Sequence, residues 1–265
     1  MIRFLSAAAA FAALFAGTAA HAAADSPDCS PAVLAALGRE LKAAHFVPGP
    51  RAAGRDQAGV VIESRCKPLP DDPRLTLAAV GWDAHKDDSK ALAIAIVDES
   101  ASAVVALRQD EVDEDATTRL NALRLDTAPY ALAPGVRAFG VDVYSDNPGC
   151  GGGGVGPRRT LYVREGRTLR PVLEDVAIGE YRYLKGDQPR CIEPGESQET
   201  ITEDHDVTIG LGAPGKSSWR DLLLTVTARR SDHQPARKPL HVRVPYDGNS
   251  YDLAAFNKAY VAWNK

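Results

Sequence analysis

Short stretches in which apolar and polar residues alternate fill most of this chain from Leu75 onward. In residues 136–144, apolar positions are separated by Arg137 and Asp142, which places one face of a β-strand on a core and the other in water. Clusters of Gly, Pro, Asn and Asp interrupt these stretches at short intervals. We therefore expect a mainly β fold, antiparallel and β-sandwich-like. The predicted strands are 60–62, 75–82, 90–97, 102–108, 119–125, 136–144, 160–164, 168–173, 180–184, 200–211, 221–229 and 239–245.

Two helices are predicted to flank the strands, one near each end of the chain. Ser30 is suited to cap the first helix, because Pro31 follows at the position where a missing N–H costs nothing. Both helices have an apolar face, which we expect to pack on the sheet. The first is expected at about 31–45, with Val33, Leu34, Leu37 and Leu41 on that face; the second is expected at about 253–263, after Asp252, with Phe256, Tyr260 and Trp263.

Residues 1–22 have the form of a secretory signal peptide. Arg3 supplies the positive start, 4–20 is an apolar segment, and Ala20-His21-Ala22 offers the small residues of a cleavage site. No cysteine follows the apolar segment, so a lipid anchor is not expected. We predict cleavage after residue 22 and a single exported β-rich domain at 23–265, located in the periplasm or outside the cell.

The charge of the chain limits its partners. The formal net charge is −4, and removing Arg3 with the signal peptide makes it −5. A mildly acidic domain of this kind argues against nucleic acid as a partner and against adsorption to an anionic membrane. No segment after the signal peptide is apolar enough to be predicted as a transmembrane helix.

Four cysteines follow the predicted cleavage site, and an even number in an oxidising compartment predicts two disulfides. Three pairings are possible. Cys29–Cys66 and Cys150–Cys191 are favoured, because each closes a local loop of about 40 residues, worth roughly 3–4 kcal/mol in the chain-entropy model.

A glycine-rich segment at 149–156 joins two of the predicted strands and leads into a cluster of arginines. If several of these arginines converge, their planar guanidinium groups suit carboxylate, sulfate or phosphate groups. The alternative is a solvated face, paired with Glu165, Glu174 and Asp175. The residues proposed to bind a ligand are Arg158, Arg159 and Arg164, with Arg167 and Arg170 close by in sequence.

Motifs that would indicate a cofactor, a metal or a nucleophile are weak or missing. The glycines match G-x-G-x-x-G, but a strand follows them where a dinucleotide site needs a helix. The acidic run at 110–115 lacks the spacing of an EF-hand and is expected to be a charged surface turn. His205 lies among three carboxylates without zinc-site spacing, so an exposed turn is favoured there over a metal ligand or a pH-sensitive group. No cofactor and no metal are predicted.

Three functions remain open. The leading hypothesis is an exported, non-catalytic binding or accessory protein, whose partner is an envelope protein or an anionic glycan. The first alternative is an envelope glycan hydrolase that uses an Asp/Glu pair, which predicts two carboxylates facing each other in a cleft, one of them with a raised pKa. The second is a structural envelope component, which predicts a broad apolar surface patch.

Overall fold

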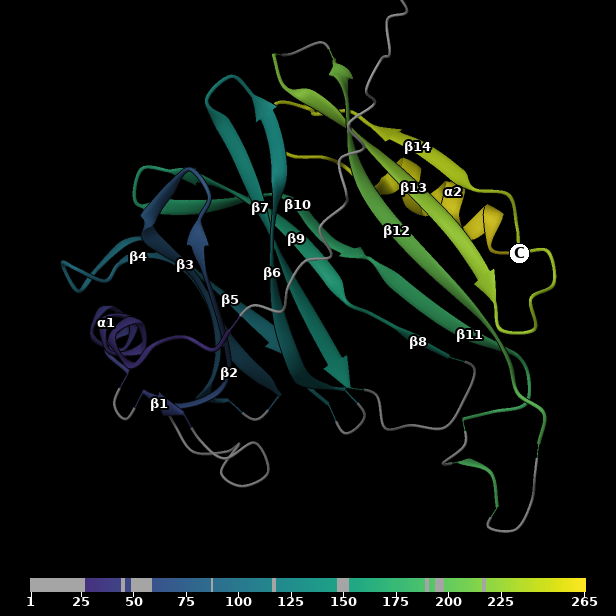
Figure 1. Cartoon of the computed structure of the whole chain (residues 1–265), viewed down its shortest axis with the longest axis horizontal. Helices are drawn as coiled ribbons and strands as arrows, with labels where there is room; N and C mark the ends of the chain where they lie inside the picture. The colour runs from purple at the N-terminus through teal and green to yellow at the C-terminus, as the bar shows by residue number, and fades with distance from the viewer. Residues whose placement is uncertain are drawn as a thin grey trace, which may run out of the picture.

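The computed structural model describes residues 27–43, 46–48, 59–86, 88–115, 118–146, 153–188, 191–193, 198–215 and 218–265. The predicted signal peptide and Cys150 lie outside these residues. The described chain forms two β-sheets and two helices (Figure 1). The elements are α1 (Pro31–Leu41), β1 (Val47–Pro48), β2 (Val60–Leu69), β3 (Asp72–Lys86), β4 (Ser89–Asp98), β5 (Ala103–Asp113), β6 (Arg119–Ala133), β7 (Val136–Asp146), β8 (Gly153–Val155), β9 (Arg158–Glu165), β10 (Thr168–Ala177), β11 (Gly179–Lys185), β12 (Ile201–Pro214), β13 (Arg220–Arg230), β14 (Leu240–Val244) and α2 (Ala254–Trp263).

The larger sheet has nine strands in the order β1-β2-β3-β4-β5-β10-β9-β7-β6, and it curls so that β6 packs against β2 and β3. Lys67 Nζ on β2 donates a hydrogen bond to the Leu125 carbonyl on β6 at 3.0 Å. Gly81 on β3 leaves room for Leu120, because a Cβ at Gly81 would lie 2.4 Å from Leu120 Cδ2. Buried side chains of β3 to β7, β9 and β10 fill the inside of the curl as one hydrophobic cluster.

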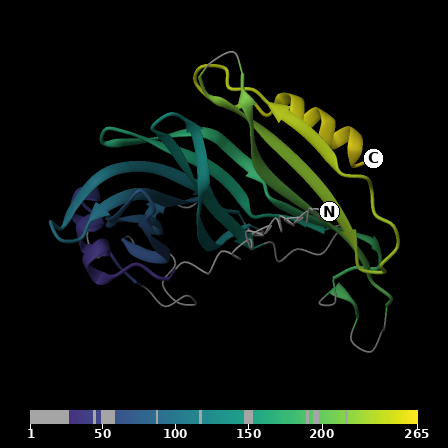
Figure 2. The ribbon, with the colours of Figure 1, turned by 45° about the horizontal axis from the view of Figure 1, so that its top comes forward.

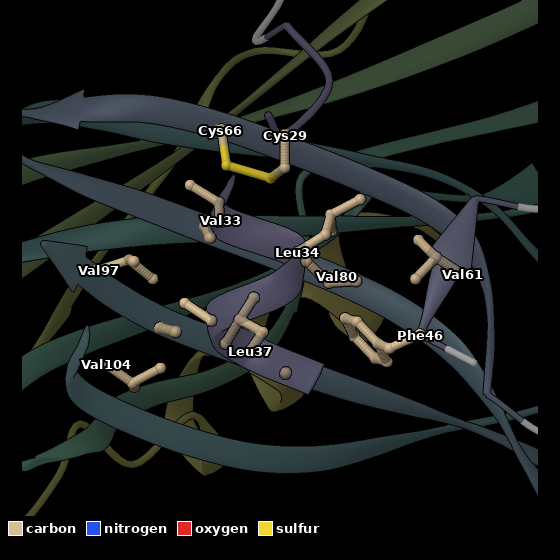
Figure 3. Close-up of a cluster of buried hydrophobic side chains, with 14 of the residues drawn as sticks. Cys29, Val33, Leu34, Leu37, Phe46, Val61, Cys66, Val80, Val97 and Val104 are labelled. Atoms are coloured by element: carbon tan, nitrogen blue, oxygen red, sulfur yellow. A yellow bond between two sulfur atoms is a disulfide. The ribbon is translucent and has the colours of Figure 1, made fainter. Parts of the chain in front are cut away.

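Helix α1 covers part of the larger sheet at its β2–β5 end. Ser30 caps it as predicted, accepting a hydrogen bond from Val33 N at 3.2 Å. Figure 3 shows Val33, Leu34 and Leu37 beside apolar side chains of the sheet. A disulfide between Cys29 and Cys66 ties the start of the helix to β2, which confirms one predicted pairing.

The smaller sheet has five strands in the order β14-β13-β12-β11-β8. Helix α2 lies along one face of it (Figure 2), with Phe256, Tyr260 and Trp263 in a cluster that includes side chains of both sheets. The predicted docking of the aromatic face is therefore confirmed. Asp252 Oδ1 accepts a hydrogen bond from Ala254 N at 2.9 Å at the start of the helix.

The chain passes between the two sheets twice at one place. β8 and β11 belong to the smaller sheet, whereas β9 and β10 belong to the larger one. The two passages are held together by hydrogen bonds from Gly156 N to the Gly179 carbonyl at 2.9 Å and from Ile178 N to the Pro157 carbonyl at 2.7 Å. Gly179 permits this approach, since a Cβ there would lie 2.8 Å from the Gly156 oxygen.

The structure confirms the mainly β architecture and the two helices, and corrects several details. The sandwich is not confirmed, because the larger sheet curls, and two strand pairs, β1–β2 and β5–β10, are parallel. The first helix ends at Leu41 rather than 45, since Lys42 adopts the left-handed conformation. The acidic run is not a turn: β5 continues through Asp113, paired with Ser89 of β4. Within the predicted glycine loop, 153–155 form β8.

Cys150–Cys191 remains a prediction, because Cys150 lies outside the described residues; no described cysteine is a free thiol. Across the described part of the chain, none of the helices has both the length and the hydropathy that crossing a membrane requires.

Candidate functional site

Two hollows adjoin at Arg158, Glu174 and Asp175, close to the place where the chain passes between the sheets. The curl-side hollow, of about 470 Å³, is lined by β4, β5, β7, β9 and β10. The helix-side hollow, of about 350 Å³, is lined by β8 to β12 and α2. We call the two together the Arg158 groove.

A β-bulge in β10 presents the two acids of the groove. Leu173 pairs with Leu161, but Val176 pairs with Arg159, so β10 carries one extra residue over this interval. Asp175 has a left-handed φ of 59°, which is uncommon for a residue other than glycine. The bulge leaves Glu174 and Asp175 exposed instead of alternating between core and solvent. Non-glycine residues held in such conformations cluster at functional sites.

Arg158 lies on β9 beside these acids of β10 and is paired with one of them. Its Nη2 donates to Asp175 Oδ2 at 2.5 Å and to the Asp175 carbonyl at 3.0 Å, and its Nε also donates to the carboxylate. This contact raises the pKa of the Arg158 guanidinium, although partial burial opposes the effect. The arginine therefore stays charged and balances one carboxylate of the groove.

Arg159 and Arg164 do not line the Arg158 groove. Arg159 is 8% exposed, and its guanidinium donates to Asp142 at 2.5 and 2.8 Å and to the Tyr130 hydroxyl at 3.0 Å. Arg164 lies at the other end of β9 and donates to the Gly166 carbonyl at 3.0 Å. Arg158 and Arg164 are six positions apart along the strand, a distance of about 20 Å. The three predicted arginines therefore form no common patch.

The curl-side hollow is rich in carboxylates and hydroxyl groups. Three of its acids are ion-paired: Asp175 with Arg158, Asp110 with Arg108 at 2.6 Å, and Glu111 with Lys86. The contact with Lys86 lowers the pKa of Glu111. The polar side chains that line this hollow, besides the three shared with the helix-side hollow, are Asp110, Glu111, Asp113, Thr118, Ser145, Thr160 and Tyr162.

The helix-side hollow combines apolar walls with a small polar group at its back. The apolar walls come from β8, β10, β12 and α2. At the back, Glu180 of β11 pairs in register with His205 of β12, and Tyr260 of α2 contacts both. His205 is 1% exposed. The apolar lining residues are Val155, Val176, Ala177, Val207, Leu253 and Phe256.

These polar groups form a chain of hydrogen bonds between two carboxylates. Tyr260 Oη donates to Glu180 Oε2 at 2.6 Å and lies 2.8 Å from His205 Nδ1. His205 Nε2 lies 3.0 Å from Glu203 Oε1. We call these four residues the Glu180–Glu203 chain. The imidazole is also in edge contact with the rings of Tyr260 and Trp263.

Two arginines hold Glu203 and the end of α2 in place. Arg182 donates to Glu203 Oε1 at 2.6 Å and to the Asn264 carbonyl at 3.2 Å. Arg237 donates to the same carboxylate oxygen at 3.3 Å and to the Trp263 carbonyl. Cations suit this position, because the last carbonyls of a helix lack partners within the helix.

Burial and neighbouring charges shift the pKa values of two groups in the Glu180–Glu203 chain, Tyr260 and Glu203. Burial raises the pKa of the Tyr260 hydroxyl, and its hydrogen bond to Glu180 raises it further. The pKa of Glu203 lies below its usual range: burial opposes the charged form, but the contacts with His205, Arg182 and Arg237 outweigh it. Tyr260 therefore keeps its proton, and Glu203 is ionised.

The prediction of an exposed turn at His205 is wrong. Glu203 and His205 point into the core from β12, while Asp204 and Asp206 alternate with them on the other face. The sequence did indicate a strand here, since buried and exposed positions alternate through residues 203–206. The cluster of charged residues was nevertheless interpreted as a turn. Nothing in the sequence linked Glu180 and Arg182 to His205, because they lie on another strand, and Tyr260 was predicted only as part of the packing face of the second helix.

Among the described residues, no group of three His, Cys, Asp or Glu side chains is placed to hold a metal ion. No family model, no curated protein and no solved structure matches the chain. Its function therefore has to be inferred from the groove itself.

Proposed function

We propose that this is an exported, non-catalytic binding or accessory protein whose Arg158 groove takes a lysine-rich segment of an envelope protein. Export is supported by the signal-peptide pattern of residues 1–22. The oxidising compartment fits the Cys29–Cys66 disulfide and the proposed second one, Cys150–Cys191.

The charge of the groove carries this proposal. Six carboxylates and one arginine are found among its described lining residues. Three of the carboxylates are balanced by ion pairs with Arg108, Lys86 and Arg158, and the other three give the groove an excess of carboxylates over cations. Such a groove attracts a cationic partner and repels an anionic glycan. The carboxylates are Asp110, Glu111, Asp113, Glu174, Asp175 and Glu180.

Binding of labelled peptides tests the proposal. A lysine–glycine peptide should bind with an affinity that falls as salt rises, and a glutamate–glycine peptide should not bind. Glu174→Gln should weaken binding by about fivefold, the effect of roughly 1 kcal/mol. Asp206→Asn is the matched control, because this exposed acid lies on β12 outside the groove. Equal binding of both peptides, or equal effects of the two substitutions, would refute the proposal.

Arg158→Ala separates the two possible ligand charges. Removing Arg158 frees the Asp175 carboxylate, so a cationic ligand should bind more tightly. If Arg158 were itself the contact for an anionic glycan, the same substitution would abolish binding. The sign of the change therefore identifies the ligand class.

One observation favours the glycan hydrolase as a second candidate. The curl-side hollow contains five carboxylates beside hydroxyl groups, a composition that suits a sugar and an acid pair. Glu111 is a poor acid for this chemistry, because Lys86 lowers its pKa. This candidate predicts that Asp113→Asn or Glu174→Gln abolishes release of reducing sugar from envelope glycan. The binding function predicts that the wild-type protein releases none.

A structural envelope component has less support. The large apolar side chains that are exposed in the described residues are distributed over several elements. They are Val47 on β1, Val155 on β8, Tyr181 and Leu184 on β11, Leu223 on β13 and Val261 on α2. The proposal of a binding protein does not depend on self-association.

A further inference from the structure

The Glu180–Glu203 chain has three hydrogen-bonded contacts, and each requires one hydrogen. The contacts join Glu180 to Tyr260, Tyr260 to His205, and His205 to Glu203. A phenol supplies one hydrogen, a neutral imidazole supplies one, and an ionised carboxylate supplies none. In their ordinary neutral forms, the phenol and imidazole therefore supply two hydrogens for three contacts.

If each of the three contacts is a hydrogen bond, the complete chain contains one additional proton. Tyr260 cannot supply it, since its one hydrogen is already used, and Glu203 is ionised. Two arginines already balance Glu203. Glu180 lines the hollow and has no such ion pair within the described residues, and its other oxygen accepts from Asn264 Nδ2 at 3.5 Å.

We propose that the helix-side hollow is a subsite for an alkylammonium group, and that binding of this group displaces the additional proton. The inference rests on the proposed function, because it identifies the part of the lysine-rich partner that the groove recognises. It also predicts that the affinity for the ammonium group rises with pH, because binding releases a proton.

The displacement balances in protons. An ammonium N–H donates to Glu180 in place of the Tyr260 hydroxyl. The hydroxyl then turns to donate to His205 Nδ1, and the neutral ring keeps its Nε2–H bond to Glu203. One proton leaves to solvent for each ammonium group bound. The Tyr260–His205 and His205–Glu203 contacts each keep one hydrogen, and the ammonium group replaces Tyr260 as the donor to Glu180.

The shape of the hollow fits a lysine side chain. Its volume of about 350 Å³ and its apolar walls suit a short methylene chain, while Glu174 and Asp175 lie at its junction with the curl-side hollow. The ionisable groups around the chain come from five segments. They are Glu180 and Arg182 on β11, Glu203 and His205 on β12, Arg237 before β14, Tyr260 on α2, and Arg158, Glu174 and Asp175 on β9 and β10.

Calorimetric titration of the mature, oxidised protein with two peptides tests the inference. One is a lysine–glycine peptide, and the other carries trimethyllysine, which keeps the charge but has no N–H to donate. Titration in buffers of different ionisation enthalpy should show one proton released for each lysine peptide bound. Its affinity should rise by up to about tenfold per pH unit while the additional proton is present. The trimethyl peptide should release no proton, and its affinity should not follow this pH dependence.

Substitutions test which residues the proton release requires, and they distinguish failure of this inference from failure of the proposed function. Glu180→Gln and Tyr260→Phe should each abolish proton release; circular dichroism would check that both variants are folded. Glu174→Gln should weaken binding of both peptides and leave proton release by the lysine peptide unchanged. Binding of both peptides without proton release, or with equal release, would refute the inference and leave the proposed function standing. Binding of neither would refute the proposed function.

Discussion

Arg158 and Arg159 are neighbours in sequence, yet their substitution by alanine should have very different effects on stability. Arg159 is buried between Asp142, Asp126 and Tyr130. Removing it leaves Asp142, which is 0% exposed, with only part of its compensation, from Arg124 at 2.7 Å. Breaking a buried ion pair from one side costs about 3–5 kcal/mol, and we expect the lower part of this range because Arg124 remains.

Arg158 pairs with Asp175 at the surface, where the two side chains are 47% and 64% exposed. Exposed pairs contribute about 0–1 kcal/mol, so Arg158→Ala should have little effect on folding. Arg159→Ala removes a large fraction of the roughly 5–15 kcal/mol by which proteins are stable. For this reason Arg158→Ala is used to test the groove, and Arg159→Ala is not.

Urea unfolding followed by tryptophan fluorescence measures both effects. With a slope of about 2–3 kcal/mol per molar urea, Arg159→Ala should lower the midpoint by about 1 M or more, and Arg158→Ala by less than about 0.5 M. Arg159→Met is a useful companion, because it keeps much of the buried volume while removing the charge. If the two alanine variants lost similar stability, or if Arg159→Ala lost less than about 1 kcal/mol, the assignment of Arg159 to a buried structural ion pair would be wrong.

Three further predictions concern other parts of the fold. Replacing Cys29 and Cys66 by alanine should lower the free energy of unfolding by about 4 kcal/mol in the chain-entropy model, for a sequence separation of 37. In urea unfolding, chemical reduction of this disulfide in the wild type should lower the stability by the same amount. Gly81→Ala should cost about 1–3 kcal/mol by overpacking against Leu120, and adding Leu120→Ala should remove part of that clash, which a double-mutant cycle would show as coupling. The folded-state pKa of Glu203 is lowered, so the stability lost in Glu203→Gln should be largest above about pH 4.3 and should diminish as pH falls through the folded-state pKa. Urea unfolding of the wild type and the variant above and below this pH measures the effect. A difference in stability that does not change with pH would contradict the prediction.

Most strands could be predicted because their signal is local. The alternation in 136–144 needs only neighbouring residues to be read, and it corresponds to β7 (Val136–Asp146). The errors occurred where local chemistry conflicts with tertiary pairing. The acids of 110–113 resembled a turn, yet β4 pairs with them and extends β5 to Asp113. Lys42 ends the first helix in a left-handed conformation that lysine does not signal.

The candidate site was only partly predictable. The sequence singled out Arg158, which lies in the groove, together with Arg159 and Arg164, which do not. Adjacent residues of a strand face opposite sides, so Arg158 and Arg159 had to separate. The bulge that presents Glu174 and Asp175 could not be read from the sequence, because it arises from the register of β10 against β9.

By itself, the sequence determined the mainly β content and the two helices, and it favoured the Cys29–Cys66 pairing among three possibilities, because periodicity, capping and short loop closure act over a few tens of residues at most. Only the tertiary structure decided which charges meet. His205 meets Tyr260 across 55 positions of sequence, and it does so because β12 and α2 share one core. Contacts of this kind depend on the order of the strands in each sheet and on the curvature of the sheets, and no local sequence pattern specifies either.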